Sequence, residues 1–359
     1  MKDIGTIKGK DEYMVSVKKT NYISILSVIC CFAVVLLHTN GCFWNFSMER
    51  YWKIANIIEC VFYFAVPCFF MISGATLLDY RERYSTRQYF VKRIKKTVIP
   101  FLVWSIIGLI YNIYVLKSIN INDVNILWVY NGIVNTSIVS IYWFFPSLFC
   151  IYLSIPLFAA VEKSSRKEVF SYLAIVGFCL NFAIPLVKNV FWANASWTIS
   201  MSVVSGNLIY IVIGYLLNEY EVSKKARRNI YIMAIIGFLI HLIGTYIVSV
   251  QAGEVLRTFK GYSSAPCIMY SVGIYVWFKY NAYRLQNSKI INKAIGIILP
   301  YTFGIYLLQW FIYKGMIHFM DINVKSLVYR LGAPFFIVPF SICIIKFIKK
   351  IPILKHIVP

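Results

Sequence analysis

The sequence predicts an all-α membrane protein, a bundle of ten transmembrane helices with the N- and C-termini on the cytoplasmic side. Three observations lead to this fold class. The 359-residue chain is 60% hydrophobic and only 14% charged, which is more apolar than a water-soluble domain of this size can bury in one core. The apolar residues lie in long runs. The 36 Lys and Arg residues lie mainly between those runs. A soluble enzyme is therefore excluded.

A helix needs about 20 mainly apolar residues to cross a membrane, because the hydrocarbon core is about 30 Å thick and each residue adds about 1.5 Å. Ten segments meet this requirement: Tyr22–Cys42, Ile54–Leu78, Thr97–Leu116, Ile141–Val161, Val169–Val187, Ile199–Leu217, Ile230–Val250, Ser264–Phe278, Ala294–Tyr313 and Ser326–Ile345. The eighth is short, and the ninth carries Pro300 in its first turns. A transmembrane domain is thus expected at residues 21–348, between cytoplasmic tails at residues 1–20 and 349–359.

The basic residues predict the orientation, because Lys and Arg are retained on the cytoplasmic side during insertion. With the N-terminus inside, 27 of the 36 Lys and Arg residues fall on cytoplasmic segments. The formal charge of +22 then reflects topology and attraction to anionic lipid. The expected partner is the lipid bilayer, and no nucleic acid is expected.

Ionisable side chains inside the spans are the first candidates for function, because each costs roughly 2.5 to 3.5 kcal/mol to insert. Glu59 is the only acidic residue well inside a span, and His38 and His241 are the histidines at membrane depth. His38 lies near the outer end of the first span and Glu59 near the outer start of the second, so the two should share a depth. A carboxylate beside an imidazole would orient it and let it take a proton from a hydroxyl group. The alternative is a buried pair that only joins two helices. For His241, packing against a carbonyl is expected.

The segment from Asp79 to Lys96 carries the densest charge of the chain. Seven cations lie within its eighteen residues: Arg81, Arg83, Arg87, Lys92, Arg93, Lys95 and Lys96. Such clusters bind phosphate groups through charge-assisted hydrogen bonds. The alternative is a stop-transfer signal that contacts anionic lipid.

Shorter features lie at the span ends. Within residues 66–74, Pro67 would free a carbonyl, and the small Ser73-Gly74 pair would admit another backbone or a ligand. Trp143 belongs to an aromatic cluster at 142–145, which fits either a membrane-interface belt or a stacking surface for a sugar ring. Tyr306 and Gln309 would offer a phenol and an amide toward the interior of the bundle.

These pieces, in this order, resemble the acyltransferase-3 family of bacterial integral membrane O-acyltransferases, especially its surface-polysaccharide O-acetyltransferase branch. The resemblance covers nearly the whole chain. It runs through residues 22–23 and 33–38, 66–74, 90–93 with 100–104, 143–144 with 152–153 and Pro156, and 303–307. Residues 66–74 and 90–104 carry its most specific motifs.

The resemblance implies a multi-pass protein of the bacterial plasma membrane. Such a protein takes an acyl group, usually acetyl from cytoplasmic acetyl-CoA, and delivers it to a glycan hydroxyl on the outer side. No metal is expected. The predicted site combines His38 and Glu59 as catalytic residues with a donor-binding and a substrate-binding group. The donor-binding residues are Arg93, Lys96, Arg87 and Lys92, and the substrate-binding residues are Trp143, Tyr306 and Gln309.

Three positions differ from the pattern common in the family. Ser27 stands eleven positions before His38, where arginine is common. Lys96 stands where a second arginine often follows the one matched by Arg93, and lysine keeps the charge but not the bidentate geometry. Gln309 stands where histidine is frequent.

The residues leave several alternatives open. His38 could act as general base on the acceptor hydroxyl or accept the acyl group itself. The protein could instead be a non-enzymatic exporter or translocase of a surface glycan, or an acyltransferase that uses another donor such as succinyl-CoA. The glycan acceptor and the oligomeric state have no signature in the sequence.

Overall fold

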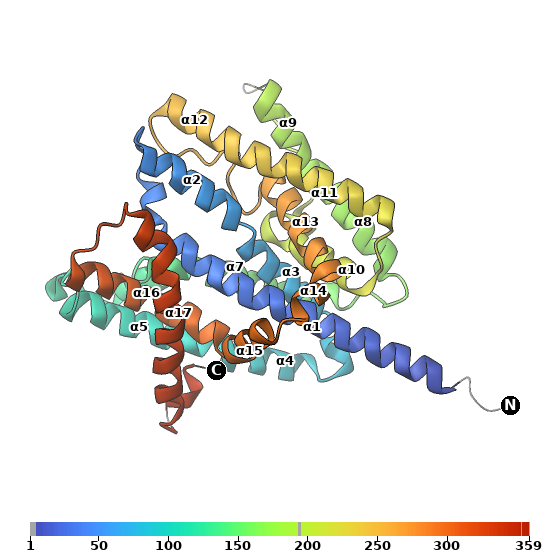
Figure 1. The fold of residues 1–359 in the computed structure, drawn as a ribbon, viewed down its shortest axis with the longest axis horizontal. Helices are drawn as coiled ribbons and strands as arrows, with labels where there is room; N and C mark the ends of the chain where they lie inside the picture. Colours follow the sequence, from blue (N-terminus) through green and yellow to red (C-terminus); the bar gives the residue numbers. More distant parts are fainter. Residues whose placement is uncertain (1–4, 193–194, 353, 359) are drawn as a thin grey trace.

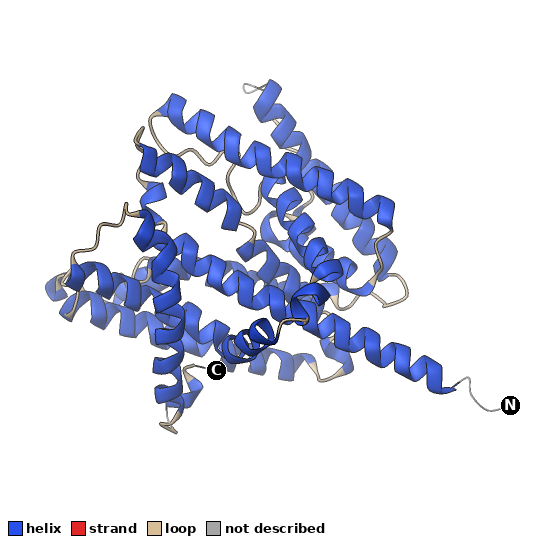
Figure 2. Cartoon of the chain, in the orientation of Figure 1, coloured by secondary structure: helices blue, strands red, loops and turns tan. Residues whose placement is uncertain are grey.

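The computed structural model describes residues 5–192, 195–352 and 354–358, with side chains from Tyr22 onward. In this part of the chain every regular element is a helix (Figures 1 and 2). The α-helices are α1 (Gly5–Thr39), α2 (Arg50–Phe62), α3 (Ala65–Leu77), α4 (Thr86–Arg93), α5 (Ile99–Tyr114), α6 (Ile126–Val134), α7 (Phe144–Phe158), α8 (Arg166–Phe178), α9 (Ile184–Phe191), α10 (Ile209–Glu219), α11 (Lys224–Leu239), α12 (Thr245–Ala252), α13 (Ala265–Asn281), α14 (Tyr283–Gln286), α15 (Lys289–Ile298), α16 (Thr302–Met320) and α17 (Leu327–Lys349).

Eight helical segments among the described residues are long and apolar enough to cross a membrane. They are Tyr22–Thr39, Arg50–Glu82, Thr86–Tyr114, Ser140–Phe158, Arg166–Phe191, Lys224–Ala252, Lys289–Met320 and Leu327–Lys349. Each overlaps one of the ten predicted spans. The chain is therefore a helical, multi-pass membrane protein. Helix α1 crosses the centre of the bundle, and its first turns project beyond the other helices (Figure 1).

The other two predicted spans are helical over shorter lengths. Helix α13 has 17 residues and coincides with the predicted span Ser264–Phe278. Helix α10 has 11 residues and begins only at Ile209, so the prediction of a helix over Ile199–Leu217 is wrong for its first half. Residues 199–208 contain only two short 3₁₀ turns, Ser202–Val204 and Gly206–Leu208.

Asn181 explains how this non-helical segment is stabilised. Irregular backbone at membrane depth is tolerated where protein groups satisfy its hydrogen bonds. The Asn181 amide nitrogen donates to the carbonyl oxygens of Met201 and Val204 at 3.0 and 3.4 Å, and its oxygen accepts from the Met201 N–H at 2.7 Å. Asn181 lies in the π-helical turn Cys179–Ala183 that joins α8 to α9. The polar side chain thus replaces helical hydrogen bonds, which apolar periodicity does not reveal.

Replacing Asn181 with leucine is expected to lower the free energy of unfolding in detergent by about 1–3 kcal/mol, because it leaves the Met201 and Val204 backbone groups unpaired. Thermal unfolding of the purified protein measures the change. Asn131→Leu is the matched control, because Asn131 is exposed on α6. Equal unfolding temperatures for Asn181→Leu and wild type would contradict this account.

Helices α3 and α10 cross at very close range. A Cβ atom on Gly74 would clash with the backbone of Ile211, and one on Gly214 would clash with the backbone of Met71. The two helices therefore approach backbone to backbone, as small residues allow in membranes. The prediction that the Ser73-Gly74 pair admits another backbone is confirmed at Gly74.

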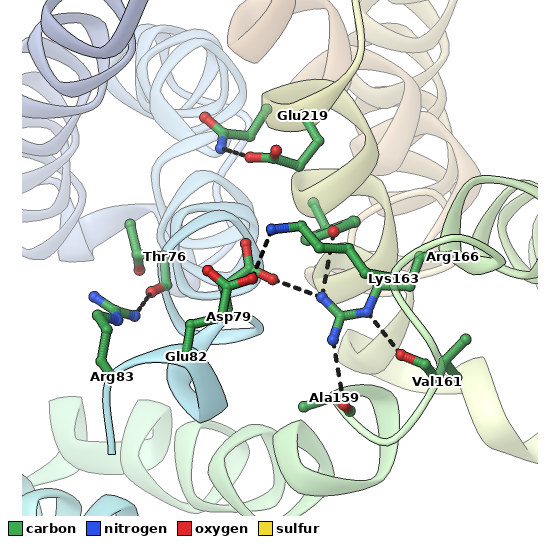
Figure 3. Close-up of polar contacts among 11 residues, drawn as sticks. Thr76, Asp79, Glu82, Arg83, Ala159, Val161, Lys163, Arg166 and Glu219 are labelled. Carbon is green, nitrogen blue, oxygen red and sulfur yellow. Dashed lines mark hydrogen bonds and ion pairs between the residues drawn. The ribbon is translucent and has the colours of Figure 1, made fainter. Parts of the chain in front are cut away.

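Arg166 joins the ends of several helices on one side of the bundle (Figure 3). Its guanidinium donates to Asp79 Oδ1 at 2.6 Å and to the Tyr215 hydroxyl at 3.2 Å. It also donates to the carbonyl oxygens of Ala159 and Val161, at 3.2 and 2.9 Å. These contacts tie the end of α3 and the α7–α8 connection to α10, so the buried charge is satisfied and fixes these helices relative to each other.

Candidate functional site

A cavity of about 620 Å³ lies inside the bundle. Its walls come from α1, α2, α3, α7 and α16, together with the loop between α12 and α13. Five of the predicted site residues line it: His38, Glu59, Trp143, Tyr306 and Gln309. Residues from distant parts of the chain thus meet at one site, whose described wall is otherwise mainly apolar or aromatic.

His38 reaches the cavity from the last turn of α1. Its ring centroid lies 6.5 Å from that of Tyr306 and 6.5 Å from that of Tyr313. Gln309 is the polar side chain that interacts with the imidazole. Buried His38 Nδ1 and buried Gln309 Oε1 have no hydrogen-bond partner within the described residues. The pair therefore combines an imidazole on the cavity wall with two buried polar atoms whose hydrogen-bonding capacity is unused.

The Tyr306 hydroxyl is already hydrogen-bonded within the protein, whereas the sequence predicts a phenol free to bind a ligand. This hydroxyl donates to the carbonyl oxygen of Ile141, and Tyr142 donates to the carbonyl oxygen of Leu307 at 2.9 Å. These bonds fasten α16 to the start of α7. Tyr306 therefore offers the cavity its ring, while its hydroxyl holds two elements together.

Glu59 is not hydrogen-bonded to His38, in contrast to the sequence-based expectation. Its carboxylate lies 3.3 Å from the ammonium of Lys260 and accepts from Asn40 Nδ2 at 3.5 Å. Glu59 is 2% exposed, and a buried carboxylate pairs most favourably with a full positive charge. His38 and Glu59 share one cavity, but they occupy separate parts of the hydrogen-bond network.

Lys260 is one of the site residues that sequence reasoning missed, with Arg257 and Arg330. It is 0% exposed, and its ammonium lies 3.6 Å from the centroid of the Tyr63 ring, a cation–π contact. The sequence gives no signal for this position, because Lys260 lies outside the apolar runs in a segment expected to be an outer loop. Only the folding of that loop into the bundle brings the cation to Glu59.

Stacked aromatic rings hold the inward-folded loop. The Tyr262 ring stacks on Tyr63 at 4.1 Å and on Trp143 at 5.0 Å between centroids. Tyr210 also donates a hydrogen bond to the Tyr262 carbonyl oxygen. Tyr262 is therefore fixed between α7 and the α2–α3 connection, and Lys260 is positioned two residues before it.

A second buried cation reaches Glu59 through Asn40. Arg330 is 1% exposed and donates to Asn40 Oδ1 at 3.2 Å and to the Tyr51 carbonyl at 3.3 Å. The nitrogen of the same Asn40 amide donates to Ala55 O at 2.9 Å. The network thus contains two cations and one carboxylate.

Arg93 is the predicted donor-binding residue that reaches the cavity wall. Its guanidinium carbon lies 5.4 Å from the ring centroid of Tyr152, which lines the cavity, and 5.8 Å from that of Tyr89. Buried Arg93 Nε has no hydrogen-bond partner in the described part of the chain. Arg93 therefore lies one side chain away from the cavity.

The other predicted donor-binding residues lie farther out. Arg87, Lys92 and Lys96 are exposed and do not line the cavity. Lys92 instead lies 3.7 Å from the centroid of the Tyr84 ring. The Ser85–Gln88 capping box sets the start of α4, so Arg87 falls in its first, exposed turn. These three cations therefore do not join Arg93 at the cavity wall.

Ser27 and His241 do not line the cavity. The Ser27 hydroxyl donates to the Ile23 carbonyl at 2.7 Å and is thus used within α1. Both His241 nitrogens lack a hydrogen-bond partner in the described region, so the expected contact with a carbonyl is absent. The His241 ring instead packs edge-on against Tyr63 at 5.0 Å.

Comparison with known proteins identifies the family of the chain. The model of the Acyl_transf_3 family, described as an acyltransferase domain, matches residues 20–346. No curated protein and no solved structure matches the chain at a significant level. The family match includes nearly all of the described helices and the whole cavity. The chain therefore belongs to the acyltransferase-3 family and is a membrane acyltransferase.

Proposed function

We propose that the protein is an O-acetyltransferase of the bacterial plasma membrane. It takes acetyl from acetyl-CoA on the cytoplasmic side and transfers it to a hydroxyl of a cell-surface polysaccharide or its precursor outside. One observation carries the proposal: the cavity that contains His38 is lined both by Tyr152, which contacts Arg93, and by Trp44 and Lys260. A donor and an acceptor could thus reach one histidine from different directions.

In this proposal, both termini and α4 face the cytoplasm, as the distribution of basic residues predicts. Arg93 binds a phosphate of the donor, because a guanidinium forms charge-assisted hydrogen bonds with phosphate. The acyl-bearing arm enters the cavity past Tyr152 toward His38. The opposite end, near Trp44, opens to the outside and admits the acceptor.

The transfer has a simple balance of bonds. A neutral His38 nitrogen removes the proton of the acceptor hydroxyl while the hydroxyl oxygen attacks the thioester carbonyl carbon. The carbon–sulfur bond breaks, an ester forms, and the proton returns to the leaving thiolate. In the alternative route, His38 first accepts the acetyl group and then passes it to the hydroxyl. Gln309 lies beside the imidazole in both routes and positions it.

Arg93→Gln is expected to raise the KM for acetyl-CoA by roughly tenfold or more. A hydrogen bond to a charged group contributes about 1.5–3 kcal/mol, and 1.4 kcal/mol corresponds to a factor of ten. The kcat should change little, because Arg93 does not touch the reacting atoms. Release of the CoA thiol by the purified protein in nanodiscs measures both constants.

Arg87→Gln is the matched control, because it removes the same charge from an exposed position on the same helix. Equal effects of the two substitutions would point to a general attraction of CoA to the basic segment and contradict a specific Arg93 contact. Absence of protein-dependent CoA release would instead favour a non-enzymatic glycan exporter. Intact-mass analysis of the modified glycan separates acetyl from succinyl transfer.

A further inference from the structure

Positive charges outnumber negative charges at the Trp44 end of the cavity. Glu59, Arg257 and Lys260 are the charged residues among its described lining. Lys260 balances Glu59 at 3.3 Å. Arg257 makes no ion pair within the described part of the chain, and its guanidinium carbon instead lies 4.6 Å from the Trp44 ring centroid. One positive charge, that of the exposed Arg257, is therefore left over at the cavity opening.

The Lys260 ammonium also has unused donors. It is fully buried, and its nitrogen has no properly oriented hydrogen bond within the described region, although Glu59 is close enough for an ion pair. An ammonium carries three N–H donors, and leaving them unused in a buried site is costly. Arg330 adds a second buried cation behind Asn40. This environment is short of anions and of hydrogen-bond acceptors.

Aromatic side chains surround the same opening. Trp44 is 40% exposed and Trp143 is 36% exposed, and both line the cavity. Flat exposed rings provide apolar surface and, for tryptophan, an N–H group, which together suit the face of a sugar ring. Trp44 and Arg257 also line a second, shallow hollow of about 530 Å³ with Glu254 as its acidic residue. A chain of more than one sugar therefore has room to continue outward past Arg257.

We propose that the acceptor is an anionic saccharide, whose carboxylate or phosphate group binds the exposed Arg257, with the buried charge of Lys260 behind it, while a nearby hydroxyl reaches His38. Arginine can bind either group through two parallel hydrogen bonds, and the lysine adds a point charge. The anion balances the surplus positive charge at this opening. This inference rests on the proposed function, because it names the acceptor class of the same reaction.

The test compares binding of matched probes to the purified protein in nanodiscs by tryptophan fluorescence and calorimetry. The probes are an oligogalacturonate, a malto-oligosaccharide of equal length and the same malto-oligosaccharide carrying a terminal phosphate. We expect an anionic probe to bind at least about tenfold more tightly than the neutral one, with a difference that shrinks as salt is added. The relative affinities of the two anionic probes show whether carboxylate or phosphate is preferred.

Arg257→Gln is expected to reduce the preference for the anionic probe to less than about threefold, while Arg257→Lys should retain part of it. Lys325→Gln is the control, because Lys325 is an exposed cation that pairs with Glu49 outside the cavity. Equal binding of anionic and neutral probes, binding of neither, or an unchanged preference in Arg257→Gln would overturn the inference. A preference for succinyl-CoA that disappears in Arg257→Gln would also overturn it, by assigning the cations to the donor.

Release of CoA in the same preparations separates this inference from the function on which it rests. Acetyl-CoA turnover without a preference for anionic probes would contradict the acceptor class and leave the acetyltransferase proposal intact. Tight binding of anionic probes without any acyl transfer would contradict the acetyltransferase proposal and leave only an anionic saccharide-binding site.

Discussion

Replacing His38 with alanine is expected to lower the rate of acetyl transfer by about 10²- to 10⁴-fold, the range of a positioned general base. The loss should appear in kcat rather than in the KM for acetyl-CoA, because Arg93 and Tyr152 remain in place. His38 Nδ1 has no hydrogen-bond partner within the described residues, so the substitution breaks no hydrogen bond at that nitrogen. Transfer of radiolabelled acetyl from acetyl-CoA to glycan measures the effect.

His318→Ala is the control for this experiment, because His318 is exposed near the end of α16. Both variants should elute as single species in detergent and unfold near the wild-type temperature. Full activity of a folded His38→Ala variant would exclude both the general-base and the acyl-carrier route.

Lys260→Met is expected to lower the free energy of unfolding by about 3–5 kcal/mol, because it leaves the Glu59 carboxylate buried without its cation. The double substitution Glu59→Gln and Lys260→Met should recover much of this loss, because it removes both charges and keeps an amide beside Asn40. Such recovery is the signature of two directly coupled residues. Thermal and denaturant unfolding of the four proteins in detergent measures it.

Lys325→Met provides the comparison for an exposed ion pair, which should change the free energy of unfolding by no more than about 0.5 kcal/mol. If Glu59 were paired with His38, Lys260→Met would resemble this control, and His38→Ala would be the strongly destabilising change. Additive effects of the Glu59 and Lys260 substitutions would contradict the ion pair.

The membrane architecture could be predicted largely from the sequence, because hydrocarbon imposes a length and a composition on each crossing helix. The non-helical structure of the first half of Ile199–Leu217 could not be predicted in this way. Its apolar composition suits a helix, but Asn181 satisfies its backbone in an extended path. A polar side chain about twenty residues earlier in the sequence thus stabilises the local structure there.

The sequence predicts the part of the candidate site that lies inside the spans, but not the part that comes from loops. His38 and Glu59 were found because ionisable residues are rare inside spans, and both line the cavity. The predicted contact between His38 and Glu59 does not form, because Lys260 enters from a loop and binds Glu59. Loop residues carry no depth signal in the sequence, so neither Lys260 nor Arg257 could be distinguished from other outer cations.

On the donor side, charge clustering identifies the basic segment but not the side chain that reaches the cavity wall. Seven basic residues marked the segment 79–96, but charge alone does not state which side chain turns inward. The start of α4 and its continuation into the π-helical turn Ile94–Val98 set the faces of this segment. Arg93 thereby meets Tyr152, while Arg87 and Lys96 remain exposed.

Transfer of acetyl between the two faces of a membrane tests the central claim most directly. The purified protein is reconstituted into proteoliposomes in one orientation, radiolabelled acetyl-CoA is supplied only on the face that carries α4, and an acceptor saccharide is supplied only on the other. The account predicts acetylated saccharide on the face opposite the donor, with CoA released on the donor face, and loss of the product in His38→Ala. Product formation only when donor and acceptor share one face would contradict it.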